Sequence, residues 1–159
     1  GGKHFSRIDL QVDDRMFHIY NAGQHHSYGD LVVHVKDDNV LWISDLAFNQ
    51  RTTFMGDGDS RQAINAQSWI LKQFADVKVM IPGHGSAQTN PFPMVTETQT
   101  YMKRLRKIMS EAITKDIDLM QAVDQAGFDD WKSSRLYELN HRTNANFVYR
   151  ELEMESFND

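Results

Sequence analysis

The sequence predicts an α/β fold, a mixed sheet with flanking helices that is followed by a helical tail. Two pairs of extended runs, at 8–20 and 31–44, are each interrupted by turn residues, as in β-hairpins. A helical period then leads to a short apolar strand at 77–81, and the later apolar residues recur at helical spacing. We therefore expect a sheet-containing part at 5–93 and a helical part at 94–159 that packs on it.

Length and composition limit the classes of protein to which the chain can belong. Its 159 residues suit one domain or a piece of a larger one, and 40% apolar residues are enough for a packed core. A net charge of −5 argues against a dedicated nucleic-acid binder, and no apolar run approaches the ~18 residues of a membrane span. The absence of cysteine excludes thiolate ligands and a cysteine nucleophile, and leaves the compartment open. Any bound metal must be held by His, Asp or Glu.

Caps and apolar stripes define the expected helices. Asp59 or Ser60 caps the first helix, and residues 96–99 (TETQ) fit a capping box at the start of the second. Asp116 caps a short third helix, and the last helix is expected at about 131–154. The predicted apolar stripe of this last helix consists of Leu136, Leu139, Phe147 and Met154.

Three places put a metal-ligand side chain beside a strand end. His26, in QHHSYGD, precedes the third expected strand, Asp45 follows the fourth, and His84 follows the fifth in PGHG. In open α/β sheets, ligand sites form outside the carboxyl ends of strands, so Asp45 and His84 can meet if their strands are neighbours. Glycine on each side of His84 permits a tight turn that aims the imidazole back over the sheet. Two imidazoles and a carboxylate suit Zn²⁺, Mn²⁺ or Fe²⁺.

Each of these residues also has a purely structural interpretation. PGHG is commonly a turn, and Asp45 can cap the segment after its strand. His25 and His26 are adjacent, so in an extended chain at most one of them serves a single site. A mononuclear iron site is a further alternative, but spacings of 19 and 39 residues between His26, Asp45 and His84 differ from the compact motif of that class. Serine hydrolysis is not favoured, because no G-x-S-x-G is present.

The order of the three motifs resembles the second half of the metallo-β-lactamase superfamily. The stretches are HSYGDLVVHV, LWISDLAF and VMIPGHG; the family pattern is a G-H-T-x-G-like turn, a strand ending in G-D and a strand ending in P-G-H. His26 matches the first histidine, because Ser27 and Gly29 then occupy the T and G positions. Asp45 matches the aspartate that bridges two metals, and His84 matches the last histidine.

The resemblance covers about residues 5–90 and implies half of an αβ/βα sandwich. Gln24 and Ser44 stand where the family has glycine, and both departures are mild. The family's first half also carries an H-x-H-x-D-H signature with four metal ligands, which these 159 residues do not contain. We therefore expect the chain to correspond to the C-terminal half of such an enzyme. Its helical tail is similar to that of zinc metallohydrolases linked to quinoprotein relay systems.

The resemblance implies a dizinc hydrolase that acts on an ester, thioester, lactam or similar bond of a small-molecule substrate. His26 would complete one metal site, His84 the other, and Asp45, the expected catalytic residue, would bridge them. Because only three ligands serve two metals, we expect weak or absent zinc binding and no activity in this chain alone. The alternative is a non-enzymatic interaction or assembly module with a degenerate metal site.

Half a sandwich also has consequences for assembly. The strands around Leu31, Val33 and Leu41 are present without the partner sheet, so we expect one apolar sheet face to be open. Such a face usually marks an interface. We expect a homodimer, or association with the N-terminal half, and no nucleic-acid or membrane partner. The competing expectation is that the C-terminal helices fold back over the open face.

Overall fold

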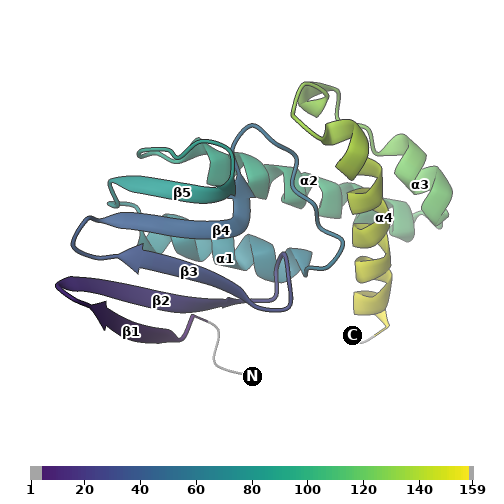
Figure 1. Cartoon of the computed structure of the whole chain (residues 1–159). Helices are drawn as coiled ribbons and strands as arrows, with labels where there is room; N and C mark the ends of the chain where they lie inside the picture. The colour runs from purple at the N-terminus through teal and green to yellow at the C-terminus, as the bar shows by residue number, and fades with distance from the viewer. Residues whose placement is uncertain (1–4, 158–159) are drawn as a thin grey trace.

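The protein folds around one five-stranded mixed sheet (Figure 1). The computed structural model describes residues 5–157. The strand order is β1-β2-β3-β4-β5; the first four strands are antiparallel neighbours, and β5 runs parallel to β4. The expected α/β fold with a mixed sheet and flanking helices is confirmed. The strands are β1 (Arg7–Val12), β2 (Arg15–Gly23), β3 (Asp30–Val35), β4 (Val40–Phe48) and β5 (Val79–His84).

The crossover between β4 and β5 is made by α1 (Ser60–Gln73), which lies along the sheet (Figure 1). Its N-cap is Asp59, whose carboxylate accepts a 2.8 Å hydrogen bond from the backbone N–H of Gln62. No helix in the described part of the chain is long and apolar enough to cross a membrane. The other helices are α2 (Pro93–Thr114), α3 (Leu119–Gln125), the short 3₁₀ helix η1 (Asp129–Trp131) and α4 (Tyr137–Ser156).

Three of the expected helix starts are wrong. The last helix, expected at about 131–154, is α4, which begins at Tyr137 after the separate turn of η1. α2 begins at Pro93, so the expected capping box at 96–99 lies inside the helix. Proline is favoured at this position because its fixed φ fits a helix and its missing N–H would have no partner in the first turn. α3 is capped by Asp118, whose carboxylate accepts a 3.1 Å hydrogen bond from the Gln121 N–H, and not by Asp116.

The buried face of α4 also differs from the expected stripe. Leu139 and Met154 are 70% and 67% exposed. The Asn144 amide, which is buried, donates a 2.7 Å hydrogen bond to the Thr53 carbonyl and accepts one of 2.9 Å from the Met55 N–H. A buried amide is tolerated when it is hydrogen-bonded, and these bonds tie α4 to the segment that follows β4. The buried residues of α4 are Tyr137, Asn140, His141, Asn144, Ala145, Val148 and Tyr149.

On one face of the sheet, α1 covers β3, β4 and β5. Val32, Leu41 and Met80 from three strands are fully buried together with Ile70 of α1, and they belong to one apolar cluster. A second cluster lies among α2, α3 and α4. α2 contributes residues to both clusters, so the tail packs on the sheet-containing part through this helix.

The opposite face of the sheet is apolar and open. Cross-strand pairing places Ile8, Ile19, Val33, Trp42 and Ile81 in one row across all five strands. None of these side chains is buried, and Ile8 is 66% exposed. The C-terminal helices therefore do not cover this face. A second such row consists of Leu10, Phe17, Val35, Val40 and Val79.

Candidate metal-binding site

The sequence suggested that Asp45 follows the fourth strand. In the structure, Asp45 lies within β4, in an irregular part of the strand. From Ser44 to Phe48, β4 advances by four residues while its neighbour β5 advances by two, from Pro82 to His84. Ser44 has a φ of 50°, in the left-handed region. Irregularities of this kind bend a strand and re-aim its side chains. The result is that the Asp45 carboxylate is placed against the end of β5.

The two glycines around His84 have separate structural reasons. A Cβ atom on Gly83 would lie 2.0 Å from Oδ1 of Asp45, so only glycine lets the carboxylate approach β5 this closely. Gly85 has a φ of 92°, and a Cβ there would lie 2.5 Å from the carbonyl oxygen of Asn49. The PGHG turn is thus shaped to bring β4 and His84 together.

The loop that carries His26 is organised by Asp30, a residue that the sequence analysis did not identify. One carboxylate oxygen of Asp30 accepts hydrogen bonds of 2.9–3.0 Å from the backbone N–H groups of His25, His26 and Ser27. The other oxygen accepts one of 2.8 Å from the Ser27 hydroxyl. Burial acts to raise the pKa of Asp30, but these backbone hydrogen bonds and the nearby His25 outweigh it and lower the pKa below its ordinary value. Asp30 is therefore a carboxylate that positions His26.

The two adjacent histidines point to different surroundings. His25 is 3% exposed, and its Nδ1 lies 3.2 Å from Asp30. Burial lowers the pKa of His25 to about 4, although the charge of Asp30 acts in the opposite direction. His26 faces Asp45 instead. The structure thus places His26, and not His25, among the expected site residues.

The three expected site residues come together around the Asp45 carboxylate. Nε2 of His26 lies 3.5 Å from Oδ2 of Asp45, and Nε2 of His84 lies 3.7 Å from Oδ1. Oδ1 of Asp45 and Nδ1 of His26 are buried without a hydrogen-bond partner. Within residues 5–157, no group of three or more His, Cys, Asp or Glu side chains is arranged to hold a metal ion. Each imidazole is thus paired separately with Asp45, and the role of all three as ligands stays a prediction.

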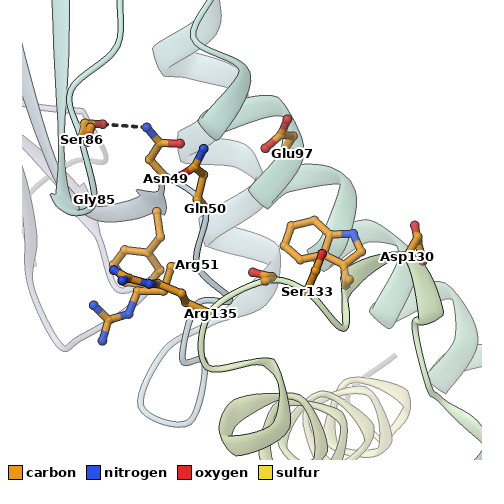
Figure 2. Close-up of a pocket in the computed structure, with 12 residues that line it drawn as sticks. Asn49, Gln50, Arg51, Gly85, Ser86, Glu97, Asp130, Ser133 and Arg135 are labelled. Atoms are coloured by element: carbon orange, nitrogen blue, oxygen red, sulfur yellow. Dashed lines mark hydrogen bonds between the residues drawn. The ribbon is translucent and has the colours of Figure 1, made fainter.

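Phe48 forms a wall between this group and a cavity. Its ring centroid lies 5.8 Å from that of His26 and 5.2 Å from that of His84. The cavity has a volume of about 650 Å³, and Phe48 and Gly85 both line it. Its other residues come from the segment after β4, from the turn after β5, from α2, and from η1 and the segment between η1 and α4 (Figure 2). A space of this size beside a polar group suits a small molecule.

Solved structures of known proteins share this fold over part of their length. The sec-alkylsulfatase Pisa1 from Pseudomonas sp. matches 91% of this chain over 25% of its own, with a TM-score of 0.74 and 15% identity. A metallo-β-lactamase from Pontibacter korlensis matches 62% of this chain over 46% of its own, with a TM-score of 0.55 and 17% identity. The protein TMB-1 matches 60% of this chain over 44% of its own length, with a TM-score of 0.51 and 17% identity. No family model matches the sequence, and no curated protein is similar to it in sequence.

The architecture is consistent with half of a metallo-β-lactamase fold. The chain spans less than half the length of each of these three proteins. Identities of 15–17% show a common fold and nothing finer. The resemblance suggested by the sequence motifs is confirmed at this level, and the chemistry has to be argued from the residues themselves.

Proposed function

We propose that the chain supplies part of the active site of a metal-dependent hydrolase, with His26, Asp45 and His84 as zinc ligands. The observation that carries the proposal is that Asp45 presents one carboxylate oxygen to each imidazole. A carboxylate in this position is suited to bridge two metal ions. The substrate would be an ester, a thioester, a lactam or a similar compound.

The distances between the imidazole nitrogens and the Asp45 carboxylate oxygens leave room for a metal ion between each pair. Two ligand bonds of ~2.0–2.2 Å at a tetrahedral angle separate their donor atoms by roughly 3.4 Å. The observed separations of 3.5 and 3.7 Å are close to this value and exceed a normal hydrogen bond. The unpartnered Oδ1 of Asp45 also needs a ligand or a donor. His26, Asp45 and His84 therefore fit zinc as part of a larger ligand set.

Each residue near the site would have a distinct task in hydrolysis. Zinc, when bound, supplies a Lewis acid and a water molecule whose pKa is lowered to about 7. Asp30 fixes the backbone of His26 and so aims its imidazole at Asp45. Gly83 leaves room for the carboxylate. Phe48 would lie against both imidazoles and hold them from the side of the cavity.

Zinc titration followed by NMR of the imidazole groups tests the proposal even if the affinity is low. We expect the His26 and His84 signals to respond together, with no sub-micromolar site, because three donors are too few for tight binding by two ions. Asp45→Asn keeps the size of the side chain but removes its charge, and we expect it to weaken zinc binding by about tenfold or more.

His18→Gln is the matched control for the zinc titration. His18 lies away from Asp45 and pairs with Asp9, at 2.6 Å. We expect zinc binding to be unchanged in this variant. Zinc affinity that is equal in the Asp45→Asn variant and the unaltered chain, or that depends on His18 instead, would contradict the assignment of the ligands.

A second candidate function, that of an assembly module, is favoured by the open apolar face of the sheet. Five strands of about six residues present a surface of roughly 24 Å by 20 Å. A contiguous apolar surface of several hundred Å² usually marks an interface. We propose that a second copy of the chain covers it when the chain is alone in solution. A standard interface buries ~800 Å² per partner, so we expect a weak dimer that depends on concentration.

A further inference from the structure

Two arginines line the cavity beside His84. Arg51 lies in the segment after β4, and Arg135 lies in the segment before α4, 84 residues later. Pairing between the two segments places Arg51 and Arg135 opposite each other. The arrangement is held by a 2.8 Å hydrogen bond from the Thr52 N–H to the Arg135 carbonyl. The cavity thus receives two cationic side chains from fixed and neighbouring backbone positions.

Neither guanidinium has an acidic partner among the described residues. Arg51 and Arg135 form no side-chain hydrogen bond or ion pair with any other residue at 5–157. Arg150, on the exposed surface of α4, is likewise unpaired. Every other arginine has an acidic partner; these residues are Arg7, Arg15, Arg61, Arg104, Arg106 and Arg142. Two of the three unpaired arginines therefore meet in one cavity.

The acidic residues of the cavity do not neutralise this pair. Asp130 accepts hydrogen bonds of 2.7 and 2.9 Å from Arg104, so its charge is already balanced. Glu97 is exposed on α2. In Figure 2, Arg51 and Arg135 lie on the side of the cavity where Gly85 is found, and Glu97 and Asp130 lie on the other side. The positive charge is thus concentrated on the side next to His84.

We propose that this cavity binds an oxyanion of the substrate, a sulfate, phosphate or carboxylate group, through Arg51 and Arg135. Two positive charges carried by paired backbone positions repel each other, and an anion bound between them relieves the repulsion. Their planar forks match the oxygens of such groups. As a statement about the substrate, the inference rests on the proposed hydrolase function. It narrows the substrate to small molecules that carry an anionic group beside the bond to be broken.

Titration with inorganic sulfate at low ionic strength tests the inference, with the arginine side-chain Nε–H signals observed by NMR. We expect the Arg51 and Arg135 signals to shift with a common affinity. Arg51→Gln and Arg135→Gln should each weaken sulfate binding by about fivefold or more, because each removes one half of the paired donors. Arg150→Gln removes the same charge from the chain at a site away from the cavity, and sulfate binding should not change.

The titration is carried out on the chain after removal of metal with a chelator and of the chelator by desalting, and also on Asp45→Asn, so that it does not depend on zinc. Sulfate binding that survives both arginine substitutions, or that is weakened equally by Arg150→Gln, would overturn the subsite whatever the zinc experiments show. Sulfate binding that needs Arg51 and Arg135 while zinc binding proves independent of Asp45 would retain the oxyanion site and refute the hydrolase function. Equal melting temperatures of the three arginine variants confirm that a weaker affinity does not arise from unfolding.

Discussion

On β4 and β5, the two faces of the sheet carry similar apolar residues in different environments. On the face toward α1, Leu41 and Met80 are fully buried. On the other face, their neighbours Trp42 and Ile81 are 41% and 37% exposed. Both sets are apolar, although a sheet with one solvated face usually alternates apolar and polar residues along each strand. An apolar pattern on both faces is the pattern of a sheet that is covered twice, and residues 5–157 supply only one of the two covers.

Because only one face of the sheet is covered, folding and assembly should depend on different residues. The face toward α1 is sealed within the chain, so its substitutions should change the free energy of unfolding. The open face contacts nothing in the described chain, so its substitutions should change association instead. The candidate metal site lies at one end of β4 and β5, and should be affected by neither kind of change.

The largest effect is expected for a core substitution on the covered face. Leu41→Ala removes a fully buried side chain, and we expect the free energy of unfolding to fall by about 2–5 kcal/mol. Urea unfolding followed by circular dichroism measures it. Ile8→Ala, at a position that is 66% exposed, is the matched control and should change the free energy by no more than about 0.5 kcal/mol. Similar losses in the two variants would show that the faces do not differ as described.

The next effect concerns association through the open face. Trp42, on β4, is the largest side chain in the row that crosses all five strands, and large aromatic side chains dominate interface energies. We expect light scattering to show a mass that rises with concentration, and Trp42→Gln to weaken the dimer by about tenfold or more, about 1.4 kcal/mol. A mass of one chain at every concentration would mean that the open face does not bind a second copy.

A smaller effect on the free energy of unfolding is expected from pH, and it should come from His34 on the covered face. His34 packs against Phe74, with ring centroids 5.5 Å apart, and burial lowers its pKa below the ordinary 6.5. Below pH 6.5, His34 takes up a proton more readily in the unfolded chain than in the folded chain. The free energy of unfolding should therefore fall as the pH is lowered below 6.5, and His34 should have no effect on it at higher pH.

His34→Gln isolates this contribution to the pH dependence. His25 and His141, whose pKa values are also lowered by burial, act in the same direction and remain in the variant. The free energy of unfolding should therefore depend less steeply on pH between 6.5 and 5 in His34→Gln than in the unaltered chain. Identical slopes would rule out the lowered pKa of His34. The open face has no titratable residue in its two rows, so association should not follow the same pH dependence.

The elements that could be predicted are those whose information is local. The hairpins, α1 and the order of His26, Asp45 and His84 follow from alternation, helical period and motif spacing. The apolar stripe predicted for α4 was wrong because this helix buries amides such as Asn144, and their partners at 53–55 are distant in sequence. Hydrophobicity alone gives no indication that a polar side chain will find such partners.

The missed residues of the site have the same explanation. Asp30 acts through backbone N–H groups, which carry no sequence signature, although its place directly after a short polar loop was a usable sign of a side chain that caps a turn. Arg51 and Arg135 meet only through the tertiary fold, and no spacing rule connects them. β4 continues beyond Ser44 through an irregular pairing with β5. Such a pairing interrupts the alternation of side chains by which a strand is predicted from the sequence.

We propose that Asp45 shares its carboxylate between two metal positions, one beside His26 and one beside His84. Anomalous diffraction from a crystal grown with zinc, recorded on both sides of the zinc absorption edge, tests it most directly. We expect density within about 2.0–2.2 Å of Asp45 and of the Nε2 atom of His26, of His84 or of both. Zinc found only at other histidines, such as His18 beside Asp9, with the Asp45 carboxylate unoccupied, would show that Asp45 does not bridge two metal positions.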